Sequence, residues 1–123
     1  MDYKATVVES SKELTAREKI KFKDLSDSVA LDGAIKDEPI FITPEAYAIV
    51  NIHNEKSDNP DYKKYIIVDK DGTTYNTGSE SFWKSFKDIW DEMSAEDEEW
   101  SLKVYKKESA NYKGKHFITC SIA

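Results

Sequence analysis

In residues 65–93 the sequence reads YIIVDKDGTTYNTGSESFWKSFKDIWDEM. Two β-prone segments, 65–68 and 73–75, flank Asp71-Gly72, a dipeptide typical of tight hairpin turns because glycine tolerates a positive φ. Apolar residues then recur at helical spacing, with polar residues on the opposite face. These apolar residues are Phe82, Trp83, Phe86, Ile89, Trp90 and Met93. The stretch therefore predicts a β-hairpin and then one amphipathic helix, over about 78–93, whose rings belong to the core.

Two helix starts carry the capping-box pattern, in which a Ser or Thr is followed three residues later by Glu. Thr77 and Glu80 have this spacing at the start of the amphipathic helix. Thr15 and Glu18 have the same spacing near the N-terminus, where they predict a short helix over about 16–25.

Further β-prone segments lie on both sides of this region. They cover residues 5–9, 28–35, 39–43, 46–53, 100–107 and 115–122. In the segment 100–107, Leu102 and Val104 alternate with Lys103 and Tyr105, so the lysine and the tyrosine point away from the core. The chain then ends in a second hairpin. The order of elements predicts an α+β fold with mainly antiparallel strands, either an OB-like small barrel or a sheet, covered by one helix.

Length and composition predict a single domain, residues 1–123, that can bury a core without disulfides. We expect Cys120, the only cysteine, to be a small buried hydrophobe, since it alternates with apolar neighbours at the end of a strand. The start of the sequence has no signal-peptide pattern, and no apolar run is long enough for a membrane helix. These features favour a cytoplasmic protein without membrane contact.

Catalytic and metal-binding motifs are not evident. His53 and His116 are far apart in sequence and belong to no recognisable acid, base or nucleophile motif. One cysteine and two separated histidines do not supply the spaced ligands of a zinc site. No glycine-rich phosphate loop is present among the four glycines. We therefore expect a binding protein, not an enzyme, with no cofactor and no bound metal.

The charge is unevenly distributed along the chain. Residues 101–123 carry five lysines and one glutamate, a net charge of +4, whereas residues 1–100 carry −10 of the total of −6. In the basic part, lysines are interleaved with aromatic rings. Proteins that bind single-stranded nucleic acid combine a basic groove with rings on which bases stack, so this composition fits such a ligand. The same lysines could instead protect an exposed sheet edge from aggregation.

Three segments, 65–73, 77–83 and 105–120, resemble small single-stranded DNA-binding proteins, OB-fold-like, of phages and mobile elements of Gram-positive bacteria. At the end of the chain, Lys103-Val104-Tyr105-Lys106, Asn111 and Gly114-Lys115-His116-Phe117 are also similar to the end of phage replication OB-fold proteins. The long acidic C-terminal tail of those proteins has no counterpart after Ile122-Ala123. The resemblance implies a sequence-tolerant protein of phage or mobile-element replication or recombination, acting in the cytoplasm of a bacterial host.

Eight side chains form the predicted nucleic-acid site. Lysines would contact the phosphates and tyrosines would stack on the bases. The residues are Lys103, Lys106, Lys107, Lys113 and Lys115, together with Tyr75, Tyr105 and Tyr112. The expected partners are single-stranded DNA and, through the resemblance, replication or recombination proteins, and self-association as a homo-oligomer is left open.

A different class of function also fits the charge distribution. The body of the chain is acidic, and residues 91–99 hold six carboxylates. A charge run of this kind is usually a solvated face, but it would also fit a phage-encoded inhibitor of a host protein, such as an anti-defence protein that mimics DNA. A third interpretation is an assembly module that pairs through an exposed sheet edge.

Overall fold

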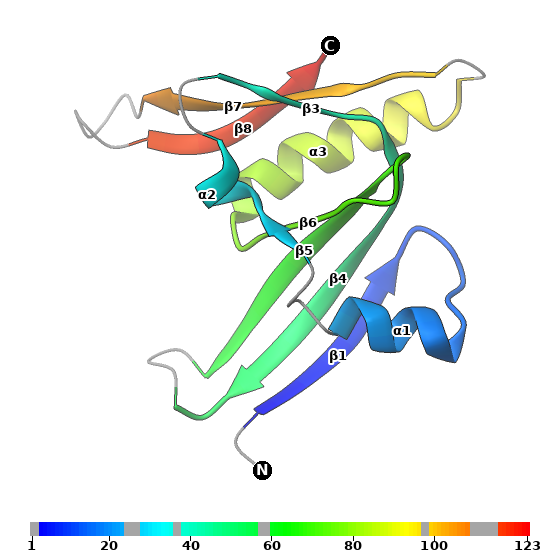
Figure 1. Cartoon of the computed structure of the whole chain (residues 1–123), viewed down its shortest axis with the longest axis vertical. Coiled ribbons are helices and arrows are strands. Elements are labelled where there is room, and N and C mark those ends of the chain that lie inside the picture. The colour runs from blue at the N-terminus through cyan, green and yellow to red at the C-terminus, as the bar shows by residue number, and fades with distance from the viewer. Residues whose placement is uncertain (1–2, 24–27, 36–37, 57–59, 97–98, 109–115) are drawn as a thin grey trace. The chain divides into compact units, whose positions relative to one another are not determined.

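The described strands form two sheets, one of five strands and one of three, and their pairs are mostly antiparallel. The computed structural model describes residues 3–23, 28–35, 38–56, 60–96, 99–108 and 116–123 (Figure 1). Contacts divide the chain into two units, of which the first contains Met1–Ala30 and Glu45–Gly78 and the second contains Leu31–Pro44 and Ser79–Ala123. The α+β class is confirmed. The single domain expected from chain length stays a prediction.

The five-stranded sheet belongs to the first unit and has the order β1-β4-β5-β6-β2. Its strands are β1 (Tyr3–Ser10), β4 (Pro44–Asn54), β5 (Asp61–Asp69), β6 (Thr74–Thr77) and β2 (Val29–Ala30). β1 is antiparallel to β4, and β5 is antiparallel to β6, whereas β2 runs parallel to β6. Helix α1 (Ala16–Lys23) contacts β1. Its Phe22 belongs to a buried cluster with Ala48, Val50, Ile52 and Ile66.

The first capping box forms as predicted at the start of α1. The Thr15 backbone N–H donates to Glu18 Oε1 at 3.1 Å, and the Glu18 N–H donates to Thr15 Oγ1 at 3.2 Å. The two bonds satisfy donors that the first turn of a helix leaves without partners. α1 ends at Lys23, and the last two residues of the predicted helix lie outside the described residues.

The hairpin between β5 and β6 is also confirmed. The Asp69 N–H donates to the Thr73 carbonyl at 2.8 Å, and the Gly72 N–H donates to the Asp69 carbonyl at 2.9 Å. Residues 70–72 therefore form a three-residue loop in which a turn is followed by a residue of positive φ. That residue is Gly72, with a φ of 92°, which explains the glycine at this position.

The three-stranded sheet belongs to the second unit and has the order β3-β7-β8. Its strands are β3 (Ile40–Ile42), β7 (Leu102–Glu108) and β8 (His116–Ile122), with antiparallel pairing throughout. Helix α3 (Glu80–Met93) packs against β8 and runs along one side of the sheet (Figure 1, yellow-green). The buried side chains of this unit come from one face of each element. They include Ile42, Phe82, Phe86, Leu102, Val104, Ile118 and Cys120.

The rings predicted for the core lie along α3. Trp83 and Phe86 are buried, with their ring centroids 4.8 Å apart. Trp90 is half-buried and packs between Phe86, at 5.8 Å, and Trp100, at 6.0 Å. The prediction that this stripe packs the core is confirmed for Trp83 and Phe86, and Trp90 lies at its edge.

Two local predictions were wrong in detail. The N-cap of α3 is Ser79, whose hydroxyl accepts from the Phe82 N–H, and not Thr77, which ends β6 and is buried. The segment 28–35 forms only the two-residue strand β2 before α2 (Leu31–Ala34). Directly after α2, the Ile35 N–H donates to the Leu31 carbonyl at 3.2 Å, so these two buried side chains follow the spacing of a helix instead of the alternation of a strand.

Candidate functional site

The face of the three-stranded sheet that α3 does not cover is the candidate site. Successive side chains of a strand point to opposite faces, so the residues next to the buried ones share this face. We call it the outer face, and its described side chains are Phe41, Lys103, Tyr105, Lys107, Phe117, Thr119 and Ser121. They include two lysines and no carboxylate. The predicted orientation of Lys103 and Tyr105, away from Leu102 and Val104, is confirmed.

Two large rings of the outer face are exposed to solvent. Phe41 on β3 is 59% exposed, and Phe117 on β8 is 40% exposed. The sequence prediction of the site missed both. For Phe41 the sequence did contain a signal, which is the alternation of a strand. Phe41 lies between Ile40 and Ile42, and if these two side chains point to the core, Phe41 points away from it. The alternation within one strand could not show that β3 pairs with β7, and this pairing brings Phe41 to the outer face.

Lys103 and Tyr105 of β7 lie close together. Lys103 Nζ is 5.6 Å from the centroid of the Tyr105 ring, a distance typical of a cation–π contact. Tyr105 is half-buried, whereas Lys103 and Lys107 are exposed. This contact places a positive charge next to an aromatic ring, the combination of side chains found in sites for single-stranded nucleic acid.

The other predicted residues do not all join this face. Lys106 is exposed, but the alternation of β7 places it on the opposite face from Lys103 and Lys107. Three of the predicted site residues lie outside the described residues. They are Tyr112, Lys113 and Lys115.

Tyr75 belongs to the first unit, on β6. Burial, and then the carboxylates of Asp69 and Asp71, raise the pKa of its phenol. Two carboxylates therefore lie near this ring. A phosphate backbone would be repelled here, so Tyr75 is the least suited of the predicted residues for contact with nucleic acid.

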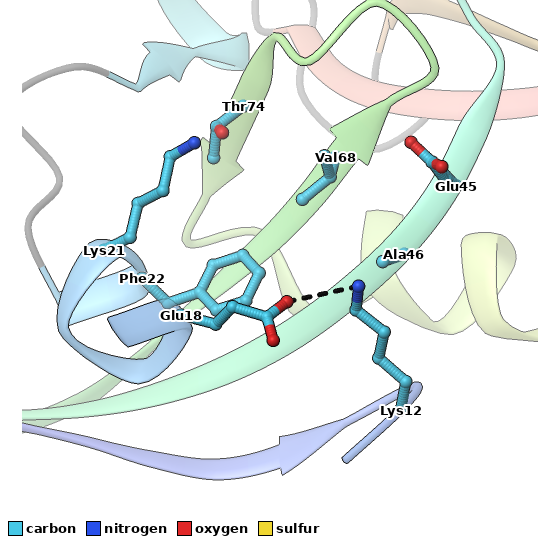
Figure 2. A pocket seen from close by; sticks show the side chains of 8 residues that line it. All are labelled: Lys12, Glu18, Lys21, Phe22, Glu45, Ala46, Val68 and Thr74. Atoms are coloured by element: carbon cyan, nitrogen blue, oxygen red, sulfur yellow. Dashed lines mark ion pairs between the residues drawn. The ribbon is translucent and has the colours of Figure 1, made fainter. Parts of the chain in front are cut away.

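A pocket in the first unit is lined by α1 and by strands of the five-stranded sheet (Figure 2). Its apolar lining residues are Phe22, Ala46 and Val68, and two further lining residues form an ion pair, Lys12 Nζ with Glu18 Oε2 at 3.2 Å. The volume is about 170 Å³, below the range of about 300–1,000 Å³ that is usual for small-molecule sites. The pocket is therefore a weaker candidate than the outer face.

The titratable groups that could carry chemistry have structural partners. His53 Nδ1 lies 2.8 Å from Asp61 Oδ1, and its Nε2 lies 3.5 Å from Glu55 Oε1. Asp61 first, and then Glu55, raise the pKa of the imidazole, which favours the protonated form. Cys120 is buried as predicted, and burial raises the pKa of its thiol to about 12. Among the described residues, no group of three or more His, Cys, Asp or Glu side chains is arranged to hold a metal ion.

Comparison of the chain with protein-family models, with curated proteins and with solved structures found no match. Within the part of the chain that the structure describes, no helix has the length and apolar character needed to cross a membrane.

Proposed function

We propose that the outer face binds single-stranded DNA with little sequence preference, as expected of a protein of phage or mobile-element replication or recombination. One observation carries the proposal: three aromatic rings and two lysines share a sheet face whose described side chains include no carboxylate. Exposed apolar side chains that gather on one face often mark a binding site. Stacking on a ring accepts every base, because each base has a π face.

Each class of side chain has a distinct role in the proposal. Lys103 and Lys107 neutralise phosphates, and this contribution to affinity weakens as salt rises. Tyr105, with Phe41 and Phe117 beside it, stacks on bases. Lys106 faces the other way and does not belong to this contact surface.

An OB-like barrel and a cytoplasmic location in a bacterial host are the finer parts of the proposal. The described strands lie in two sheets, and the three-stranded sheet alone supplies the outer face. The binding surface therefore does not depend on closure of a barrel.

Fluorescence anisotropy with a labelled 20-mer of thymidylate tests the proposal. We expect binding at 50 mM salt that weakens at 200 mM, with a slope of log K against log salt of about −0.7 for each phosphate neutralised. A duplex of the same length is the control and should bind more weakly, since its bases are not free to stack on the rings. No binding of the single strand at 50 mM salt would overturn the proposal.

A second function, inhibition of a host protein, is favoured by the acidic end of α3. Asp91 and Glu92 in the last turn, and Glu96 and Glu99 after it, are exposed. Capture from host lysate separates the two functions. A stoichiometric host protein that stays bound after nuclease treatment would favour inhibition, whereas capture that disappears with nuclease would favour DNA binding.

A further inference from the structure

The three rings of the outer face lie on one diagonal line across the sheet. Phe41 on β3 pairs with Lys103, and Phe117 on β8 pairs with Lys107. Tyr105 lies on the middle strand, two residues from each of these lysines. Each phenylalanine is therefore a diagonal neighbour of Tyr105, one on either side. All three rings belong to the second unit, so the line depends only on the register of one sheet.

The register also gives the spacing of the rings. Diagonal neighbours on adjacent strands are about 7–8 Å apart, so the line from Phe41 to Phe117 is about 15 Å long. Successive bases in a helical strand are only about 3.4 Å apart. Bases that remain stacked on one another cannot reach one ring each. A strand can use all three rings only when its bases are splayed apart.

We propose that the outer face holds three consecutive nucleotides of an extended single strand, one splayed base on each of Phe41, Tyr105 and Phe117. This inference rests on the proposed function and defines its smallest ligand. It also excludes duplexes as ligands of this face, because base pairing and stacking hold their bases at the short spacing.

The lysines follow the same line. Lys103 is the direct cross-strand partner of Phe41, and Lys107 is that of Phe117. Direct partners have Cβ atoms about 4.5–5.5 Å apart, so each end ring has a cation within reach of the phosphate of its nucleotide. The Lys103 ammonium also lies 5.6 Å from the centroid of the middle ring, Tyr105. Both ends of the three-nucleotide ligand thus have a base contact and a phosphate contact.

The arrangement predicts how affinity depends on ligand length. Each base gained on a ring contributes about 5- to 150-fold in affinity, the range that alanine substitutions of stacking residues show. Affinity should therefore rise steeply from one to three nucleotides. Beyond three it should rise only slowly, through the larger number of ways in which a longer strand can occupy the site.

Competition of short thymidylates, dT2 to dT8, against a labelled 20-mer measures this dependence. For the intact protein we expect a steep gain from dT2 to dT3 and a shallow one afterwards. Phe41→Ala and Phe117→Ala should each weaken binding of the 20-mer at least about fivefold and should remove the gain from dT2 to dT3. Phe41→Leu and Phe117→Leu, which keep apolar bulk in a folded sheet, should weaken binding in the same direction.

Ile122→Ala is the matched control. Ile122 is an exposed apolar side chain of the same sheet, 49% exposed, but it pairs with buried Leu102 and points to the opposite face. Its variant should bind the 20-mer as the intact protein does. Phenylalanine variants that bind like Ile122→Ala, or a gain that stays steep up to dT8, would overturn the three-ring site and leave the proposed function standing. Failure of the intact protein to bind the 20-mer would overturn both.

Discussion

Replacing single lysines of β7 by glutamine separates contact at the outer face from a general effect of charge. Lys103, Lys106 and Lys107 are all exposed and lie within five residues of one another. Each change removes one positive charge and keeps most of the side-chain stem. Only Lys103 and Lys107 point to the outer face, so Lys106→Gln is the control with the same change in net charge.

The expected effect follows from the release of counterions. A lysine that neutralises one phosphate of a single strand contributes about 0.7 to the slope of log K against log salt. Lys103→Gln and Lys107→Gln should therefore each reduce the slope by about 0.7, and the double variant should reduce it by about 1.4. When salt rises from 50 to 200 mM, the intact protein should lose about two- to threefold more affinity than each single variant and about sevenfold more than the double variant.

Anisotropy of a labelled 20-mer of thymidylate at four salt concentrations gives these slopes. Thermal unfolding of each variant checks that the fold is retained, since exposed substitutions usually change stability by less than about 0.5 kcal/mol. If Lys106→Gln reduces the slope as much as Lys103→Gln or Lys107→Gln, binding responds to overall charge and the outer face is not the contact surface.

Three further predictions concern local structure. Gly72→Ala should lower the free energy of unfolding, measured by urea titration, by about 1–2 kcal/mol, because the φ of Gly72 is 92°. The control is Gly33→Ala, which adds a methyl group in open space at a residue without a positive φ and should not destabilise the protein. Equal effects of the two changes would contradict the turn geometry. His53→Gln should lower the free energy of unfolding more at pH 6 than at pH 8. Because the pKa of His53 is raised in the folded protein, its pairing with Asp61 stabilises the fold below about pH 6.5, and this stabilisation is lost as the pH rises through the folded-state pKa. A loss of stability that does not depend on pH would refute the pairing. Cys120 should react with a thiol reagent at pH 8 more than about a hundredfold slower in the folded protein than in urea, and similar rates would contradict its burial.

Local patterns in the sequence were sufficient for the elements whose cause is local. The Asp71-Gly72 turn, the Thr15–Glu18 capping box and the alternation of β7 depend on residues within a few positions of one another. The cap of α3 was misplaced because Thr77 has a glutamate, Glu80, at the capping-box spacing, whereas the true cap, Ser79, has Phe82 there. Only the pairing of Thr77 in β6 decides between them.

The candidate site was only partly predictable, because it depends on contacts between distant residues. Lys103, Tyr105 and Lys107 were found from the composition of one segment. Phe41 precedes them by more than sixty residues, and it joins the outer face only because β3 pairs with β7. Composition alone also could not exclude Lys106, since the face to which a lysine points depends on which side of the strand is covered.

The central claim is that nucleic-acid bases stack on the rings of the outer face, and NMR of the aromatic side chains tests it most directly. During titration with dT6, the ring protons of Phe41, Tyr105 and Phe117 should shift together and saturate at one ligand concentration. The ring protons of Phe82 and Phe86, which are buried under the sheet, should stay in place. Saturable binding of the oligonucleotide with no change at the three outer rings would contradict the account.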